Sequence, residues 1–279
     1  MPATVMVPLD GSPAAEAALP WAVQLAKRSG GEVRLVGVHA PPAVLLDGET
    51  LGTVIPDEPV RQKEAEYFAG VQARLKSAGV PVAADLLDGG VVSSLAEYAT
   101  TLRPAWVVML SHARGAVARF FRGETASEFV RESPCPVLLV HEADDPAAAP
   151  AVRHVLVPLD GSPLAERVIE PAAAFARTFG ADVTLLVAQA DARHPDADGY
   201  LARQAAVLRP RGLAVETRVA AEARAADVIA AAADARPGTV VALATHGRGG
   251  LSKLVWGSVT DQVVHRTRHP VLVFKPSEN

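Results

Sequence analysis

A glycine-rich stretch near the C-terminus has residues that could bind phosphate. It runs from Ala244 to Thr260, continues the apolar run Thr239–Leu243, and reaches Gly257-Ser258, where a helix-like segment begins. An apolar run rich in β-branched residues is typical of a strand buried on both faces. Glycines let backbone N–H groups approach a ligand, and a helix start adds free N–H donors and a partial positive charge. The stretch therefore predicts an anion-binding loop, with Ser258 as helix cap, phosphate ligand or indirect metal ligand.

A glycine-rich loop also fits a flexible surface turn, and the loop alone does not choose between the two interpretations. The Walker A pattern G-x-x-x-x-G-K-[ST] is absent, and the dinucleotide pattern G-x-G-x-x-G does not occur here. The choice between an anion-binding loop and a surface turn therefore depends on the rest of the chain.

The composition indicates a globular protein with packed cores. The chain has 279 residues, of which 49% are hydrophobic and 21% charged, enough for two domains of ordinary size. A net charge of −4 argues against a nucleic-acid partner, which would require a basic face. Neither a signal peptide nor an apolar run of about 18 residues is present, so we expect a cytoplasmic protein without a membrane partner.

The single cysteine and the histidines do not indicate catalysis. Cys135 lies in an apolar, strand-like run, cannot form a disulfide within the chain, and has no apparent activating partner. His112 and His246 have no recognisable nucleophile or carboxylate partner in the sequence, which favours a positional role at strand ends. His39 is expected to be structural.

The chain contains an internal duplication. Val5–Pro13 and Val155–Pro163 share the run PLDGSP, a match that chance does not explain. Each copy predicts a buried strand, a turn and a helix, with Ser12 and Ser162 as N-caps. The expected first helices are Ala14–Arg28 and Leu164–Thr178, ending near Gly30 and Gly180.

Alternating strand and helix signals continue in both halves, which predicts a parallel sheet with helices on both faces. Pro41–Glu58 looks like an insertion that forms a loop or lid, because it contains Gly and Pro residues that interrupt helices and strands. The expected boundaries are a first domain at 1–141, an acidic, Pro/Ala-rich linker at 142–151 and a second domain at 152–279. The further strands are expected at Glu32–His39, Val82–Leu87, Trp106–Leu110, Pro136–Val140, Asp182–Gln189, Ala214–Val219, Thr239–Leu243 and Pro270–Phe274. The further helices are expected at Arg61–Ser77, Val92–Thr100, Ala197–Leu208, Ala225–Ala233 and from Val259 onward.

Ligands of such sheets bind beyond the carboxyl ends of the strands, where the strand order reverses. Asp10 and Asp160 end the first strands, and Ser111-His112 and Thr245-His246 end the fourth strands. If the first and fourth strands are neighbours, these groups converge on one crevice in each half. Because Asp-Gly-Ser is also a sequence typical of turns, the two aspartates could instead be turn formers.

The combination of an aspartate after the first strand, S/T-H-G, nine residues and Gly-Ser resembles the universal stress protein family, in a tandem form that covers both halves. The family pattern is G-x-x-G, nine residues, then G-[ST]. The second half has Ala244-Thr-His-Gly247, nine residues, then Gly257-Ser258, so Ala244 replaces the first glycine.

The resemblance implies two tandem Rossmann-like domains of the adenine nucleotide alpha hydrolase-like type. Each would have an open five-stranded parallel sheet of order 3-2-1-4-5, with helices on both faces and ATP in the crevice. Mg²⁺ or Mn²⁺ would be held through phosphates near Ser258, with no direct protein ligand. Asp160 would bind ribose, the backbone near Ala190 would read adenine, and the loop would hold phosphates. The resulting set in the second half is Pro158, Leu159, Asp160, Ala190, Ala244, His246, Gly247, Arg248, Gly249, Gly257, Ser258, Val259 and Thr260.

The first half departs from the pattern, since Ala113 replaces a glycine and Glu124 replaces the serine. A carboxylate at about 4 Å from a phosphate charge costs about 4 kcal/mol at an effective dielectric constant of about 20. Either Glu124 only favours the helix start in a degenerate half, or Thr125 and Arg114 restore binding with a changed geometry. We expect an occupied second half and a weak or empty first half. The weaker set is Pro8, Leu9, Asp10, Ala40, His112, Ala113, Arg114, Gly115, Gly123 and Thr125.

Three functional hypotheses follow. The first is a cytosolic ATP-binding stress regulator that is not an enzyme, because no base for activating water is evident. The second is a slow ATPase or a phosphoryl- or adenylyl-transfer enzyme, although the H-x-G-H and S-G-G-x-D-S patterns are missing. The third is a nucleotide-free or cyclic AMP-binding scaffold.

The resemblance also implies pairing of the fifth strands, Val137–Val140 with Val271–Phe274, in an internal pseudo-dimer. Such pairing would cover two exposed sheet edges. Association of two chains into a homodimer is left open.

Overall fold

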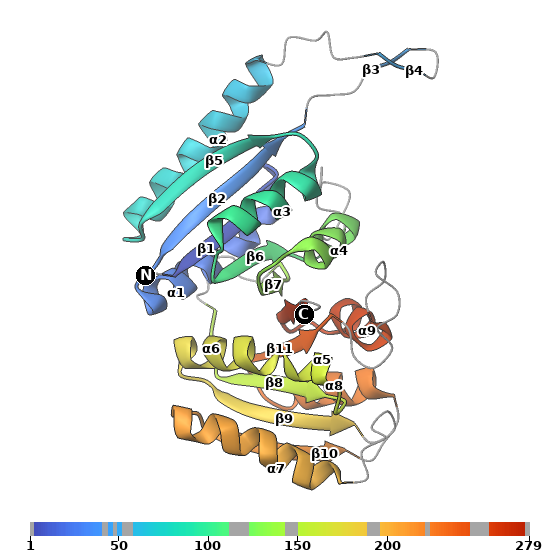
Figure 1. Ribbon diagram of the computed structural model, residues 1–279. Coiled ribbons are helices and arrows are strands. Elements are labelled where there is room, and N and C mark those ends of the chain that lie inside the picture. The colour runs from blue at the N-terminus through green and yellow to red at the C-terminus, as the bar shows by residue number, and fades with distance from the viewer. Residues whose placement is uncertain are drawn as a thin grey trace.

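The computed structural model describes residues 3–40, 44–46, 49–51, 58–111, 123–142, 150–188, 196–220, 224–245 and 257–276. It consists of an N-terminal half, up to Val140, and a C-terminal half, from His154 (Figure 1). The N-terminal half contains β1 (Thr4–Pro8), a 3₁₀ turn (Ala15–Ala18), α1 (Leu19–Ser29), β2 (Glu32–His39), β3 (Val44–Leu46), β4 (Glu49–Leu51), α2 (Glu58–Ser77), β5 (Val82–Asp88), α3 (Val91–Leu102), β6 (Trp106–Leu110), α4 (Gly123–Glu132) and β7 (Val137–Val140). The C-terminal half contains β8 (His154–Leu159), α5 (Pro163–Glu166), α6 (Ile169–Phe179), β9 (Asp182–Ala188), α7 (Ala197–Leu208), a 3₁₀ turn (Arg209–Arg211), β10 (Val215–Ala220), α8 (Ala225–Asp234), β11 (Thr239–Ala244), α9 (Ser258–Arg266) and β12 (Val271–Phe274).

The main strands form one continuous ten-stranded sheet of order β10-β9-β8-β11-β12-β7-β6-β1-β2-β5. Within each half all pairs are parallel and follow the order 3-2-1-4-5, as predicted. The fifth strands β12 and β7 pair antiparallel, with Leu272 opposite Leu138. This pairing confirms the internal pseudo-dimer and joins the two halves through backbone hydrogen bonds.

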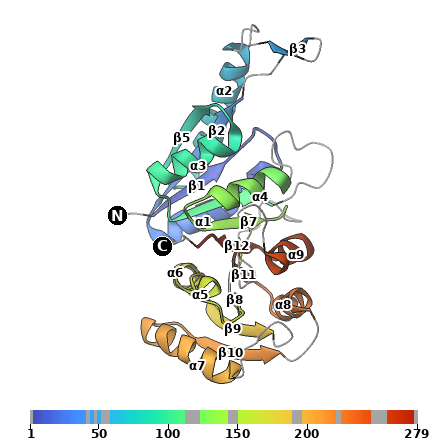
Figure 2. The same cartoon turned by 45° about the vertical axis from the view of Figure 1, so that its right-hand side comes forward.

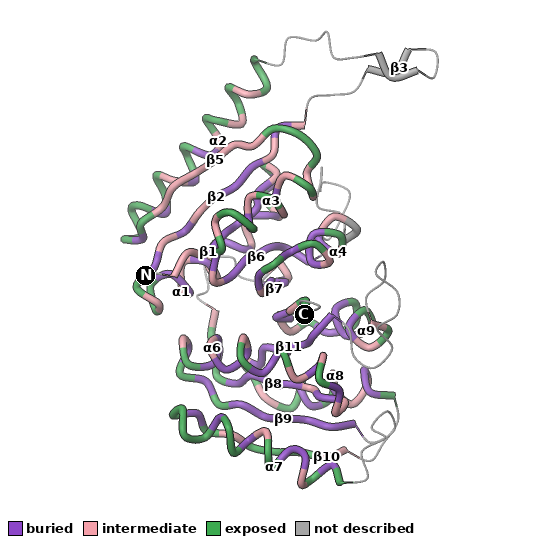
Figure 3. The backbone as a smooth tube through the Cα atoms, viewed as in Figure 1, coloured by how far each residue is buried: buried purple, intermediate pink, exposed green. Residues whose placement is uncertain are grey.

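Helices cover both faces of the sheet and enclose two apolar cores, each of which extends through both halves (Figures 2 and 3). One core contains side chains of α1, α2, α6 and α7, such as Leu25, Phe68 and Leu201. The other contains side chains of α3, α4, α8 and α9, such as Leu95 and Phe129. The central strands are buried on both faces, which explains their continuous apolar runs.

The first helix of each half was predicted wrongly as one continuous helix. The structure breaks it into the 3₁₀ turn and α1 in the N-terminal half, and into α5 and α6 in the C-terminal half. Pro20 and Pro171 lie in the first turns of α1 and α6. A proline ring clashes with the carbonyl four residues earlier, so a helix cannot pass through it unbroken.

The expected helix ends are confirmed except at Ser12, because Ala14 is the N-cap of the first 3₁₀ turn. The hydroxyls of Ser12 and Ser162 accept hydrogen bonds from the N–H groups of residues 15 and 165, at 3.3 and 3.1 Å. Gly30 and Gly180 end α1 and α6 with φ of 62° and 67°. The other predicted elements are present with small shifts at their ends.

The expected insertion Pro41–Glu58 contains the antiparallel hairpin β3–β4, which is separate from the main sheet. Its last residue, Glu58, begins α2. The rest of this segment and most of the expected linker, residues 143–149, lie outside the described residues. No helix in the described ranges combines the length and apolarity needed to span a membrane.

Cys135 is buried, and burial raises the pKa of its thiol to about 11. The sulfur is therefore a protonated core group at neutral pH, as the sequence predicted.

An aromatic cluster, made of Trp106, Phe175 and Phe179, packs the two halves together beside the β7–β12 pair. The rings of Trp106 on β6 and Phe175 on α6 meet edge to face with centroids 5.5 Å apart. The rings of Phe175 and Phe179 are 4.9 Å apart, and the guanidinium of Arg28 lies 5.2 Å from the Phe179 ring. This cluster adds side-chain packing to the backbone pairing of the junction.

We predict that Trp106→Ala destabilises the protein by about 3–5 kcal/mol, because it leaves a cavity at the junction. A double-mutant cycle with Phe175→Ala should give a coupling of about 0.5–1.5 kcal/mol, measured by denaturant unfolding. Phe129, which packs in the core on the other face, is the control partner. Equal coupling of Trp106 to Phe129 would contradict a specific contact across the junction.

A buried histidine joins three strands of the C-terminal half. His154 on β8 is 4% exposed; its Nδ1 lies 3.1 Å from Thr239 Oγ1 and its Nε2 lies 2.8 Å from Thr184 Oγ1. The Thr239 hydroxyl donates its proton to the Arg236 carbonyl at 2.6 Å. Thr239 Oγ1 must therefore accept from Nδ1–H, and Nε2 accepts from Thr184. Burial, and then the nearby Arg236, lower the pKa of His154, so the neutral ring is favoured.

We predict that this histidine makes stability depend on pH below about 6.5, the pKa of an unfolded histidine. Because the folded pKa is lowered, the unfolded chain takes up a proton that the folded chain does not, and stability falls as pH decreases through this range. Denaturant unfolding between pH 5 and 8 measures the free energy of unfolding of the parent protein and of His154→Gln. As the pH decreases, this free energy should fall less steeply for His154→Gln, by up to about 1.4 kcal/mol per pH unit. Parallel curves for the two proteins would contradict the prediction.

Candidate functional site

The turns after β1 and β8 are built by the two predicted aspartates. Asp10 Oδ1 accepts hydrogen bonds from the N–H and the hydroxyl of Ser12, at 2.9 and 2.5 Å. Asp160 Oδ1 accepts from the Ser162 N–H at 2.9 Å. The intervening glycines have φ of 79° and 78°, a conformation that favours glycine. The turn-forming interpretation is therefore confirmed for one oxygen of each carboxylate, and ribose binding stays a prediction.

In the C-terminal half, hydrogen bonds hold the two ends of the glycine-rich loop together. The Gly257 N–H donates to the Thr245 carbonyl at 2.8 Å, and the Thr260 hydroxyl donates to the Ala244 carbonyl at 2.9 Å. The start of α9 is thus fixed at the carboxyl end of β11. Since β8 pairs with β11, Asp160 follows the neighbouring strand at the same edge of the sheet.

The expected cap of α9 was one residue out of place. Gly257 is the N-cap and has no side chain to accept from the first turn, whereas Ser258 is the first helical residue. The N–H groups of residues 258–260 have no acceptor within the helix, because an α-helix leaves its first donors unpaired. The first turn of α9 thus has the donor set that suits an anion.

The structure brings together part of the predicted set. Pro158 and Leu159 are strand residues that lead into the Asp160 turn, and Leu159 is buried. In the N-terminal half, Pro8 ends β1, Gly123 begins α4, and Thr125 lies in the first turn of α4. The predicted residues outside the described part are Ala190, His246, Gly247, Arg248 and Gly249 in the C-terminal half and His112, Ala113, Arg114 and Gly115 in the N-terminal half.

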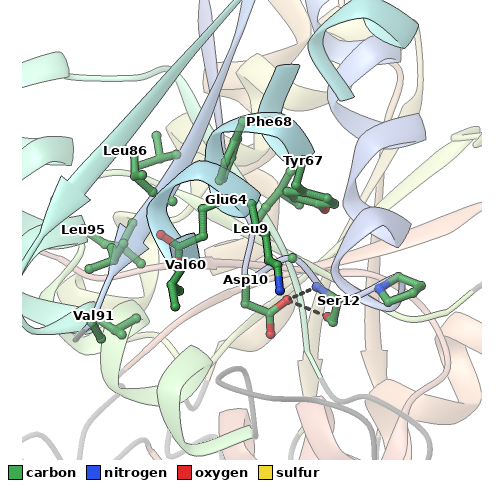
Figure 4. Close-up of a pocket in the computed structure, with 17 residues that line it drawn as sticks. Leu9, Asp10, Ser12, Val60, Glu64, Tyr67, Phe68, Leu86, Val91 and Leu95 are labelled. Carbon is green, nitrogen blue, oxygen red and sulfur yellow. Dashed lines mark hydrogen bonds between the residues drawn. The ribbon is translucent and has the colours of Figure 1, made fainter. Parts of the chain in front are cut away.

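A cavity of about 680 Å³ opens at the carboxyl ends of β1 and β2 in the N-terminal half (Figure 4). Leu9, Asp10 and Ala40, three of the predicted residues of this half, line it. Its other walls come from β2, β5, α2 and α3. The remaining lining residues are Gly11, Ser12, Pro13, Val36, Gly37, Val38, Val60, Lys63, Glu64, Tyr67, Phe68, Leu86, Val91 and Leu95.

The contribution of α2 to this cavity was not predicted. Glu64 Oε2 lies 2.8 Å from Nδ1 of His39, which is 1% exposed at the end of β2. Because an ionised carboxylate only accepts, Nδ1–H donates to Glu64. An ion pair between Arg61 and Asp88 also fastens α2 to the end of β5. No local pattern in the sequence relates Glu64 to His39, since the two residues meet only after α2 packs on the sheet.

Tyr67 of α2 also lines the cavity (Figure 4). Burial, and then Glu16 in the adjoining 3₁₀ turn, raise the pKa of its hydroxyl. Glu16 is itself paired with Arg74 of α2 at 2.6 Å. The hydroxyl therefore stays protonated near neutral pH and is available only as a neutral hydrogen-bonding group.

Within the described ranges, no cluster of three or more His, Cys, Asp or Glu side chains is arranged to hold a metal ion.

Residues 1–141 and 151–275 each match the model of the universal stress protein family. The chain belongs to this family. It is 30% identical to a universal stress protein of Mycobacterium tuberculosis over 184 residues, which cover 61% of this chain and only 62% of that relative. A universal stress protein of Mycolicibacterium smegmatis is 26% identical and matches almost end to end, over 98% of this chain and 97% of the relative.

Solved structures of the family share the two-domain fold. A universal stress protein from Archaeoglobus fulgidus has a TM-score of 0.77 at 19% identity, covering 100% of this chain and 98% of its own. A putative universal stress protein from Pseudomonas aeruginosa has a TM-score of 0.65 at 16% identity, and the match covers 98% of this chain and 93% of that protein. The tandem fold predicted by resemblance is therefore confirmed.

We predict that the packing of Phe68 of α2 against β2 requires a glycine at position 37. A Cβ at this position would lie 2.5 Å from Cε2 of the Phe68 ring and 2.9 Å from Leu86 Cδ1. Gly37→Val should therefore destabilise the protein by about 1–3 kcal/mol in denaturant unfolding. The corresponding pair in the C-terminal half is Val187 with Leu201, so adding Phe68→Leu to Gly37→Val should recover most of the loss. Additive losses in the double variant would contradict this packing.

Proposed function

We propose that the protein is a cytosolic, nucleotide-dependent regulator of the stress response that binds ATP in its C-terminal half. The observation that carries the proposal is the start of α9, which has no side-chain cap and is tied to the end of β11 beside the Asp160 turn. Unpaired helix donors at the carboxyl edge of a parallel sheet are suited to phosphate.

In this proposal, the N–H groups at the start of α9 and the Ser258 hydroxyl hold the phosphates, and Asp160 binds the ribose hydroxyls. Mg²⁺ or Mn²⁺, when bound, neutralises charge on the phosphates, and Ser258 is the residue placed to assist it. The Thr260 hydroxyl is not counted among the ligands, because it donates to the Ala244 carbonyl.

The same donor set favours binding over catalysis. N–H groups and a hydroxyl stabilise phosphate, but none of them takes a proton from an attacking water. A slow ATPase, or an enzyme of phosphoryl or adenylyl transfer, remains the competing function, and steady-state turnover separates it from a binder. Repeated turnover of ATP that Ser258→Ala abolishes would favour the enzyme, because a protein that only binds ATP loses affinity alone in this variant.

We predict that Ser258→Glu abolishes ATP binding by the C-terminal half. The substitution copies Glu124 of the N-terminal half and puts a carboxylate beside the phosphates. A repulsion of about 4 kcal/mol per charge pair corresponds to a loss of affinity of more than about 100-fold. Isothermal titration calorimetry with ATP and Mg²⁺ measures this loss.

Ala206→Glu adds the same charge on the exposed side of α7 and is the matched control. It should bind ATP like the parent protein. If Ser258→Glu and Ala206→Glu bind ATP equally well, the start of α9 is not the phosphate site. If the parent protein binds no adenine nucleotide, the nucleotide-free scaffold is the better account.

A further inference from the structure

The cavity of the N-terminal half differs from the expected adenine site in having a carboxylate within it. Glu64 lines the cavity together with Asp10, and its side chain is 31% exposed (Figure 4). The surrounding walls are mostly apolar, with Val38, Leu86 and Leu95 among them. A ligand that fills this space must therefore offer an apolar body and hydrogen-bond donors to Glu64.

His39 fixes the position of that carboxylate. The ring is buried to 1% exposure, and its Nδ1–H donates to Glu64 Oε2 at 2.8 Å. One bond to a two-oxygen carboxylate leaves acceptor capacity, since an ionised carboxyl group has about four lone-pair sites. Glu64 is thus a preorganised acceptor and does not have to be ordered when a ligand binds.

The two halves differ at this position. Tyr67-Phe68 of α2 corresponds to Tyr200-Leu201 of α7, and the residue three positions before the tyrosine is Glu64 in one half and Ala197 in the other. The C-terminal half therefore has no carboxylate at the equivalent place. Glu64 therefore distinguishes the cavity of the N-terminal half from the equivalent place in the C-terminal half.

The donor pattern of purine bases decides which base suits a carboxylate. Guanine presents two adjacent N–H donors, N1–H and the 2-amino group, which match the two oxygens of a carboxylate. Adenine presents its 6-amino group beside an unprotonated ring nitrogen, whose lone pair opposes a carboxylate oxygen. Ring nitrogens that find no donor are costly to bury, so the mismatch lowers affinity as well as fit.

We propose that the cavity of the N-terminal half is a second ligand site that takes a guanine base, with Glu64 as the specificity-determining residue. The base lies between β2 and α2 with its donor edge on Glu64, and the sugar points to Asp10. The placement of the sugar rests on the ribose role proposed for the aspartates. Lys63, which also lines the cavity, provides a cation for a phosphate on the sugar.

The test compares guanosine and adenosine binding to the full chain by calorimetry or ligand-observed NMR. We expect guanosine to bind at least about tenfold more tightly than adenosine to the site that depends on Glu64. Glu64→Gln should remove this preference and shift it toward adenosine, because a carboxamide pairs with the donor–acceptor edge of adenine. Glu64→Asp, which keeps the charge but shortens the side chain, should weaken guanosine binding without a gain for adenosine.

Glu66→Gln is the matched control, since it neutralises an exposed carboxylate on the same helix. It should keep the preference of the parent protein. Glu64→Gln can still accept from His39, and a thermal melt checks that it is folded. Equal binding of the two nucleosides, a guanosine preference that survives Glu64→Gln, or binding of neither nucleoside would overturn the proposal.

ATP titration of Glu64→Gln distinguishes this proposal from the proposed function. Unchanged ATP binding with a lost guanosine preference supports both. A Glu64-dependent guanosine preference in a protein that does not bind ATP supports the guanine site and overturns the ATP site of the C-terminal half.

Discussion

The antiparallel pairing of β7 with β12 is the interaction on which the rest of the architecture depends. A parallel five-stranded sheet ends in an edge of unpaired N–H and C=O groups, and joining two such edges satisfies both. The pairing makes the two sheets one, so that both apolar cores extend through both halves. Trp106 and Phe175 then pack directly across the junction. The two halves are therefore one folded unit.

Within this shared frame the two halves differ chemically at the carboxyl ends of their strands. In the C-terminal half, Thr260 ties the start of α9 to β11 and leaves the first turn of the helix for an anion. In the N-terminal half, Ala126 occupies the position of Thr260, and Glu124 occupies that of Ser258. The cavity there is instead shaped by α2, through Phe68 packed against Gly37 and Glu64 held by His39. The two halves share the scaffold but differ in the side chains at these positions.

The strand order and the repeat could be predicted from sequence because their signals are local. The PLDGSP segments mark the first strands, and the buried strands are long apolar runs. The signal for the helix break, Pro20 and Pro171, was also local. The prediction was nevertheless a continuous helix in each half, because it relied on the capping signal of Ser12 and Ser162. The role of Glu64 could not be predicted, because its distance from His39 is set by the packing of α2 on β2. The ribose role of Asp160 remains a prediction, since its confirmed hydrogen bond builds the turn.

The most direct test of the central claim is the nucleotide content of the purified full chain. The protein is incubated with ATP and Mg²⁺, freed of unbound nucleotide and precipitated with acid, and the released nucleotides are identified and counted per chain. The account predicts adenine nucleotide at a single equivalent per chain, because only the C-terminal half has a helix start suited to the triphosphate. Release of no adenine nucleotide, or of two equivalents of ATP per chain, would contradict it.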